Sequence, residues 1–190
     1  MATFTLDTNC IIDIADSRPA KPYVLELARA HAEGKADVAI AAVSASERQQ
    51  GDIYLDSYNV FRERLEALGL GHLTEIRGIA YWGISYWDQA LYPTDEMSAR
   101  EEIIHRVLFP NIPFLWADFS ALANIAVDAI KDTKAKRWRN AFCDRQMFWA
   151  HDHAGRDVFV TSDANFIKLA SHQDFPTVST AVRIQASGAE

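Results

Sequence analysis

The sequence lacks long hydrophobic runs and has few cysteines. No apolar stretch approaches the roughly 20 residues that a membrane-spanning helix needs, so we expect no membrane partner. The two cysteines, Cys10 and Cys143, make no metal motif, and we expect reduced, packed thiols. The N-terminal residues show neither the positive segment nor the apolar core of a secretory signal. These absences predict a soluble protein of the cytoplasm.

The chain also lacks an excess of positive charge. Its formal net charge is −7, which argues against binding to nucleic acid through general positive charge. An enzyme that gathers carboxylates around a cation is also acidic without its ion, so the sign of the charge decides nothing by itself. What the sequence does have is 190 residues with 49% hydrophobic content, enough for one domain covering 1–190.

Strand and helix patterns alternate along the chain. Strands are expected at 3–6, 37–43, 157–161 and 178–184. Helices are expected at 10–14, 22–34, 44–47, 54–68, 114–130, 140–154 and 164–170. This alternation predicts an α/β fold, a three-layer α/β/α sandwich with a mainly parallel central sheet. We interpret 72–113 as a helical and aromatic insertion, which carries Tyr81, Trp82, Tyr86, Trp87 and a second capping box at 98–101.

Acidic residues follow three of the expected strands. Asp7 comes directly after the first strand, and Asp163 lies two residues past the strand that ends at Thr161. Glu47 falls in the first turn of a helix that a Ser-x-x-Glu capping box predicts to begin at Ser44. Functional groups of parallel sheets lie at the carboxyl ends of the strands, so we expect these acids to meet. Each also has a plainer explanation: Asp7 as a polar turn, Glu47 as the capping partner of Ser44, and Asp163 as a helix cap.

A fourth acid, Asp144, lies inside an otherwise apolar helical stretch. Burying a carboxylate there is unfavourable unless a cation pairs with it. Asn140, one helical turn earlier, would share its face, although Asn140 also suits the N-cap of that helix.

These motifs together resemble the PIN-domain family. The resemblance rests on Phe-Thr-Leu-Asp-Thr-Asn at 4–9, Ser-x-x-Glu at 44–47, Asp144 before an apolar helix, and Val-Thr-Ser-Asp-Ala-Asn-Phe at 160–166. It implies that Asp7, Glu47, Asp144 and Asp163 form the acidic quartet of the family. Asn9 falls on the Asp-x-Asn turn and Thr161 on the Thr before the last acid, while Asn165 stands where many members have a further acid. A second tightly held metal is therefore in question.

The resemblance further implies a Mg²⁺- or Mn²⁺-dependent endoribonuclease with an RNA substrate. Many bacterial members are toxins neutralised by an antitoxin protein, and such relatives tend to form homodimers. Hard cations prefer carboxylate and water oxygens, so the quartet needs neither Cys nor His. We assign Asp7 and Asp144 as direct ligands, Asp163 as a ligand directly or through water, and Glu47 as a ligand or as the group that orients the attacking water.

One basic cluster precedes the helix of Asp144. We expect Lys134, Lys136, Arg137 and Arg139, with Lys131 and the interleaved Trp138, to steer an RNA backbone and stack a base, or else to form a solvated charged face. His151 and His153 are expected at the surface, near the end of that helix.

Two other function classes compete with the nuclease. A PIN-like module without catalysis could bind RNA or protein, although the retention of all four acids speaks against it. A phosphatase with an Asp nucleophile would need a second Asp two residues after Asp7, where this chain has Asn9.

Overall fold

The computed structural model describes residues 1–47, 54–86, 88–167, 169 and 175–181. A five-stranded sheet of parallel strands in the order β3-β2-β1-β6-β7 forms its centre. The strands are β1 (Thr3–Leu6), β2 (Asp37–Ala41), β3 (Thr74–Ile76), β6 (Val158–Val160) and β7 (Thr177–Ser179). In register, Leu6 of β1 lies between Ile40 of β2 and Val160 of β6, so these three strands end together. The predicted α/β class with a mainly parallel sheet is confirmed.

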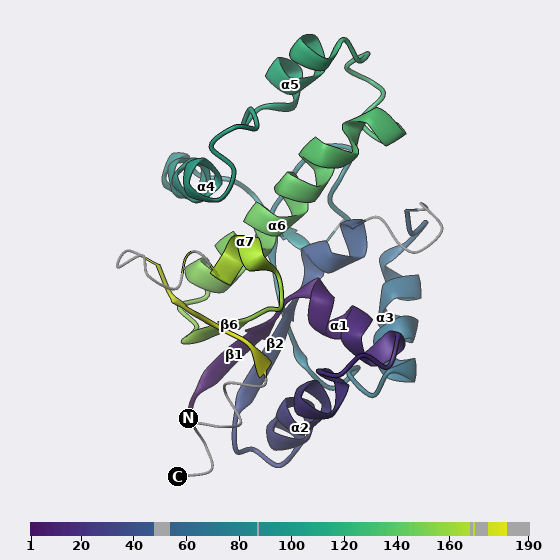
Figure 1. Ribbon diagram of the computed structural model, residues 1–190, viewed down its shortest axis with the longest axis vertical. Coiled ribbons are helices and arrows are strands. Elements are labelled where there is room, and N and C mark those ends of the chain that lie inside the picture. Colours follow the sequence, from purple (N-terminus) through teal and green to yellow (C-terminus); the bar gives the residue numbers. More distant parts are fainter. Residues whose placement is uncertain (48–53, 87, 168, 170–174, 182–190) are drawn as a thin grey trace.

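Helices cover both faces of this sheet (Figure 1). One core contains residues of α1 (Thr8–Ala15), α2 (Lys21–Ala32) and α3 (Tyr58–Ala67), and the other contains residues of α4 (Asp95–Leu108), α6 (Lys136–His153) and α7 (Ala164–Ile167). Successive strand side chains point to opposite faces. Accordingly Val38 and Ile40 of β2 enter the first core, whereas Ala39 and Ala41 enter the second. The three layers follow from this alternation.

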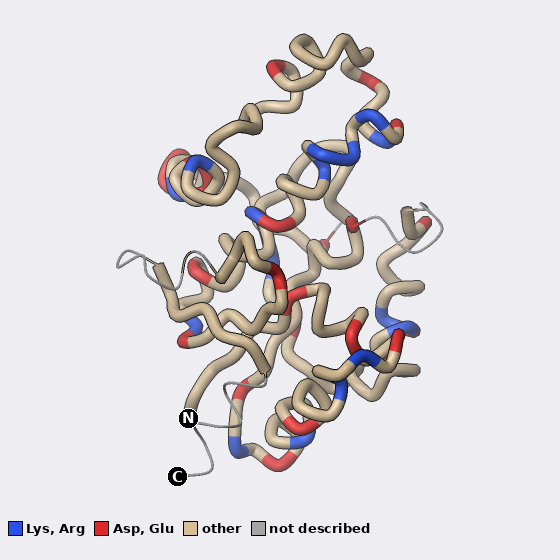
Figure 2. Tube along the Cα trace, in the orientation of Figure 1, with Lys and Arg blue, Asp and Glu red and all other residues tan. Residues whose placement is uncertain are grey.

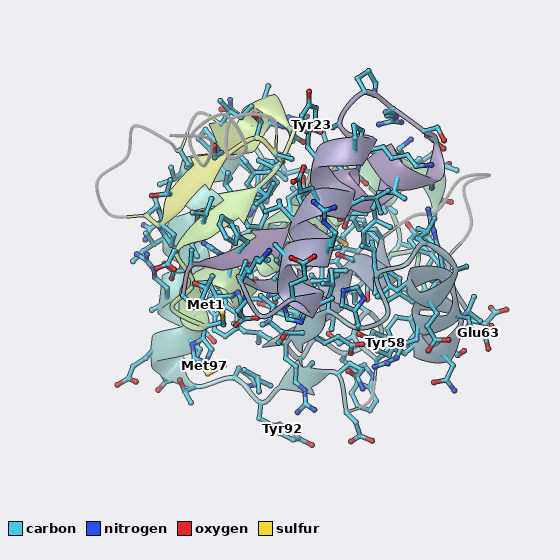
Figure 3. The ribbon with its side chains drawn as sticks, turned by 90° about the horizontal axis from the view of Figure 1, so that it is seen from below. Met1, Tyr23, Tyr58, Glu63, Tyr92 and Met97 are labelled. Atoms are coloured by element: carbon cyan, nitrogen blue, oxygen red, sulfur yellow. The ribbon has the colours of Figure 1, made fainter. Side chains whose placement is uncertain are left out.

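The segment 72–113 contributes to the central sheet. Its β3 forms one edge, beside β2, and its α4 packs against α6. Between them β4 (Gly78–Ile79) and β5 (Ala90–Leu91) pair in a small separate sheet. That 72–113 is an insertion stays a prediction. Figure 3 views this side from below and shows Tyr92, just after β5, pointing away from the body, where it is 85% exposed.

Two predicted helices differ in extent from the observed ones. The expected helix at 114–130 is only α5 (Trp116–Ala123), because Asn124 adopts a left-handed φ of 52° that ends it. In contrast, α6 starts before the expected Asn140. The carboxylate of Asp132 accepts a hydrogen bond from the Lys134 N–H and starts the short 3₁₀ helix η2 (Thr133–Ala135), which runs into α6. Asn140 is therefore one turn inside the helix and not its N-cap.

Both expected capping boxes are wrong. Residues Ala42–Ser46 form the 3₁₀ helix η1, and Glu47 follows it in extended conformation. The Ser44 hydroxyl accepts a hydrogen bond from Thr8 and caps no helix. Thr94 is the N-cap of helix α4 and its side chain accepts the Met97 N–H, so Glu101 lies well inside the helix.

The ends of two other expected elements fall outside the described residues. The strand expected at 178–184 is observed as β7 at Thr177–Ser179, and the helix expected at 164–170 as α7 at Ala164–Ile167. Residues 168, 170 and 182–184 belong to the part that is not described. No helix in the described ranges is long and apolar enough to cross a bilayer.

Candidate active site

The four predicted acids line one pocket with a cavity volume of about 480 Å³. Asp7 is the first residue after β1, Glu47 follows η1, Asp144 lies in the middle of α6, and Asp163 follows β6. Three of them therefore come from the carboxyl ends of the adjacent strands β2, β1 and β6, and α6 crosses above to supply the fourth. The sheet topology brings together residues that are up to 156 positions apart.

Asp7 is held in place by its neighbours in the sheet. Its backbone N–H donates to Val160 O at 2.9 Å, and the residue as a whole is 2% exposed. Oδ2 accepts hydrogen bonds from Thr161 Oγ1 at 2.5 Å and from Asn9 Nδ2 at 3.1 Å. The structure thus places the side chains of Asn9 and Thr161 in contact with Asp7, and their supporting role stays a prediction. The Asp7 side chain makes no hydrogen bond that caps α1, which argues against the plain capping role.

Asp163 forms hydrogen bonds with Thr161 and Asn165 and also lines the pocket. Its N–H donates to Thr161 Oγ1 at 2.9 Å, so one hydroxyl connects it with Asp7. Its Oδ1 accepts the backbone N–H of Asn165 at 2.6 Å, as a helix cap does, while the side chain also lines the pocket. Asn165 is exposed and is not among the described residues that line the pocket, and its supporting role stays a prediction.

Glu47 reaches the pocket from the end of η1. Thr8, the middle residue of the Asp-Thr-Asn turn, makes a side-chain hydrogen bond with Glu47 and also donates to Ser44 Oγ at 2.8 Å. Both Thr8 and Ser44 line the pocket. These two hydroxyls tie the turn after β1 to the turn after β2, and so fix the relative positions of Asp7 and Glu47.

Asp144 shares one face of α6 with two other pocket residues. Lys136, Asn140 and Asp144 are spaced by four residues, and all three line the pocket. Asn140 is exposed and lies one helical turn before Asp144. Asp144 is partly buried in an otherwise buried stretch of helix.

The carboxylates raise one another's pKa. Burial raises the pKa of Asp7 to about 6, and the charge of Asp163 adds to this, while hydrogen bonds from Thr161 and Asn9 oppose it. Loss of solvation and the charges of Asp7 and Asp163 raise the pKa of Glu47 to about 8, against a hydrogen bond from Thr8. For Asp144, burial and then the charges of Glu47, Asp7 and Asp163 hold the pKa well above its usual range. Carboxylates in this arrangement favour a cation among them.

The donor set fits a hard divalent cation, but the side chains are not drawn together around one. Among the described residues, no group of three or more His, Cys, Asp or Glu side chains forms a metal-binding cluster. Carboxylates without a shared cation repel, which favours their separation within the pocket. The fit to Mg²⁺ or Mn²⁺ rests on the oxygen ligands and on their mutual effect on pKa. That the quartet holds a metal therefore stays a prediction.

The predicted basic cluster is divided. Figure 2 shows Lys and Arg along the chain that leads into α6. Lys131, Lys134, Lys136 and Arg137 are exposed, and Lys136 lines the pocket. Trp138 and Arg139 are buried, at 2% and 3% exposure, so neither belongs to a surface that steers RNA and stacks a base. The helical period explains this, because positions 138 and 139 face the core when 136 and 137 face solvent.

Two cations of the pocket wall were missed by the sequence interpretation. Arg18 follows the end of α1, and Arg64 lies three residues after the buried Phe61 on α3. Arg18 pairs with Asp16 at 3.0 Å. The three-residue spacing indicates that Arg64 shares a helix face with Phe61, but the sequence does not show that α3 lies beside the acids.

The expectation that His151 lies at the surface is wrong. It is fully buried, with Nδ1 2.9 Å from Thr5 Oγ1, and burial lowers its pKa to about 4. His151 points into the sheet because it follows Phe148 by three residues on the core face of α6. His153, at the end of the helix, is exposed as expected.

The expected aromatic cluster is divided between core and surface. Tyr81 and Tyr86 are partly buried and hydrogen-bonded, whereas Trp82 is 90% exposed. Trp87 lies outside the described residues. Cys10 and Cys143 are buried free thiols, as predicted.

No model of a known protein family matches the chain, and no curated protein sequence matches it either. A solved structure that resembles it is VapBC2 from Rickettsia felis bound to a DNA fragment from their promoter. The identity is 12%, the match covers 94% of this chain and 98% of the other, and the TM-score is 0.45. A similarity at that level carries no argument about activity, so the functional argument rests on the residues of the pocket.

Proposed function

We propose that the chain is a Mg²⁺- or Mn²⁺-dependent endoribonuclease that hydrolyses RNA phosphodiester bonds in the acidic pocket. The observation that carries this proposal is that Asp7, Glu47, Asp144 and Asp163, from four distant segments, line one cavity. The PIN-like motifs at 4–9 and 160–166 support the assignment of the reaction.

The residues have distinct roles in this proposal. Asp7, Asp144 and Asp163 would hold the cation, which would lower the pKa of a water and offset charge that develops on the scissile phosphate. Glu47 would be a further ligand or would orient the attacking water; a cation beside it would lower its pKa from about 8, so that its carboxylate could accept a proton near neutral pH. Thr161 and Asn9 orient Asp7 Oδ2. The pocket thus pairs ligands with a proton acceptor.

Cations on the pocket wall suit an anionic substrate. Arg18, Arg64 and Lys136 line the same cavity as the acids. They come from the end of α1, from α3 and from α6, and so surround the carboxylates on several sides. Phosphate groups of a strand on either side of the scissile bond would contact such groups.

Cleavage of labelled single-stranded RNA by the purified chain tests the proposal. We expect cleavage with Mn²⁺, none with EDTA, and a fall of about a thousandfold or more in Asp7→Asn. Asp128→Asn, an exposed acid away from the pocket, is the matched control and should cleave normally. Binding of RNA without cleavage under every condition would overturn the nuclease and favour the inactive RNA-binding module.

The antitoxin, the homodimer and the cytoplasmic location remain predictions. If the chain is a toxin, its expression should arrest growth of the host cell, and Asp7→Asn should abolish the arrest. An antitoxin would then be recognised as a protein that restores growth and co-purifies with the chain.

A further inference from the structure

A second cavity lies beside the acidic pocket and has a volume of about 240 Å³. Ser46 lines this cavity, while Glu47, the next residue, lines the acidic pocket. Likewise Arg139 lines the second cavity and Asn140 lines the first. The two cavities therefore lie on either side of the η1 end and the first turns of α6.

Arg139 is a buried cation in the wall of this cavity, with 3% of its surface exposed. Its Nη2 donates to Ser46 O at 2.7 Å, and its guanidinium carbon lies 4.2 Å from the centre of the Tyr54 ring. Within the described ranges, Nε and Nη1 have no hydrogen-bond partner and the guanidinium has no ion pair. A buried charge without a counter-charge is unfavourable, so the site is electrostatically incomplete.

The remaining polar groups of the cavity favour an anion. The hydroxyls of Ser46 and Tyr86 donate to the carbonyls of Ile84 and Leu55. Ser85, also in the wall, donates to the carbonyl of Ile79, and the two cationic donors among the described residues of the wall are Arg139 and the exposed Lys131. Asp56 also lines it, so the described part of the wall has two cations against one carboxylate and is net positive.

We propose that the Arg139 cavity is a phosphate-binding site, separate from the acidic pocket. Arginine is well suited to a phosphate group because its planar guanidinium presents several N–H donors to the phosphate oxygens. One phosphodiester charge would balance the net charge of the wall. The phosphate belongs either to a small phosphorylated compound or to a nucleic-acid strand, and the cavity has room for the group and part of what it is attached to. This inference does not depend on the nuclease activity.

Calorimetric titration of the full chain with inorganic phosphate tests the site. EDTA in all solutions prevents phosphate from binding through a cation in the acidic pocket. We expect affinity to fall about tenfold or more in Arg139→Gln and severalfold in Lys131→Ala. Arg137→Ala, an exposed cation next to Trp138 that is not among the residues of the cavity wall, is the matched control and should leave affinity unchanged.

The outcomes separate the alternatives. Equal affinity in the unmodified chain and Lys131→Ala, or no binding of millimolar phosphate, would overturn the site even if Arg139→Gln fails to fold, which circular dichroism would reveal. A short single-stranded RNA that competes with phosphate would identify a strand as its source, and a nucleoside monophosphate that competes where the RNA does not would identify a small compound. Cleavage of RNA by the unmodified chain with Mn²⁺ is scored separately, so its failure leaves this site standing.

Discussion

Two neighbouring residues of α6, Asp144 and Arg145, stand in opposite environments. Arg145 is 1% exposed and its charge is paired with that of Glu101. Nε donates to Glu101 Oε1 at 2.7 Å and Nη1 to Phe114 O at 2.9 Å. Glu101 in turn accepts from Gln146 at 2.7 Å and from Tyr81 at 2.6 Å. The charged groups that shift the pKa of Asp144 are the carboxylates of Glu47, Asp7 and Asp163.

On one helix, therefore, Arg145 belongs to a pair that stabilises the fold, and Asp144 belongs to a group of acids that suits ligand binding. A buried pair whose hydrogen bonds are all made stabilises a particular arrangement, here that of α4 on α6. Carboxylates that raise one another's pKa destabilise the folded chain unless a cation binds among them. The first region should therefore respond to substitution by unfolding, and the second by a change in what it binds.

The largest effect is expected for the buried pair of Glu101 and Arg145. Glu101→Ala leaves Arg145 buried without its counter-charge and should lower the free energy of unfolding by about 3–5 kcal/mol. Urea denaturation followed by circular dichroism measures this. Glu102→Ala, on the exposed side of α4, is the control and should change stability little. Similar losses in the two variants would remove the contrast between the regions.

The acids of the pocket should make stability fall as pH rises, which is opposite to the effect of a salt-bridged acid. In the folded chain the pKa of Asp7 is about 6 and that of Glu47 about 8, above the ordinary 3.8 and 4.5, so the folded state binds more protons than the unfolded state. Stability of the metal-free protein should therefore fall as pH rises from about 4 to 8, on the order of 3 kcal/mol for the Asp7 shift alone.

Asp144→Asn removes one of the repelling charges and should flatten this fall. The measurement is the urea midpoint from pH 5 to 8 in EDTA, with Asp128→Asn as the control. A midpoint that rises with pH in the unmodified chain would contradict the coupled arrangement of the acids.

Divalent cation should reverse the same destabilisation. At about a hundred times its dissociation constant, Mn²⁺ should raise the free energy of unfolding by about 2.7 kcal/mol, because it binds only the folded chain. The melting temperature at pH 7.5 measures this, with Asp7→Asn expected to lose most of the increase. An unchanged melting curve in millimolar Mn²⁺ would count against the site.

The smallest effect concerns the cations of the pocket. Lys136→Ala should weaken RNA binding in EDTA severalfold, by about 1 kcal/mol, and lower the slope of its salt dependence by about one ion. Arg137→Ala serves as the comparison, since Arg137 is exposed but does not line the pocket. Equal losses in the two would mean that RNA follows the whole exposed basic run.

Strands β1, β2, β6 and β7 and the positions of the acids could be predicted because their signals are local, whereas the edge strand β3 lies in 72–113, where no strand was expected. Leu6 followed by Asp7, and Val160 followed closely by Asp163, show in a few residues both a buried strand and the polar group at its end. Asp144 was conspicuous because it interrupts an apolar helix face. The order of the parallel strands then brings these local features to one edge.

The remaining features depend on contacts that the sequence does not display. Glu101 resembled a capping residue until α6 supplied Arg145, 44 positions later. Ser44 resembled an N-cap, but its hydroxyl accepts a hydrogen bond from Thr8 at the start of α1. Arg139 looked like one of a run of surface cations, and only the position of η1 against α6 shows that it is buried.

The bond between Thr161 and Asp7 spans 154 positions and has a consequence for synthesis of the chain. Strand β1 cannot gain its neighbour β6, nor Asp7 its hydroxyl partner, before the residues up to Thr161 have left the ribosome. A nascent or truncated chain therefore carries the acidic residues without the pocket that they form. Whatever chemistry the pocket performs is withheld from the translating ribosome until the last strands are made.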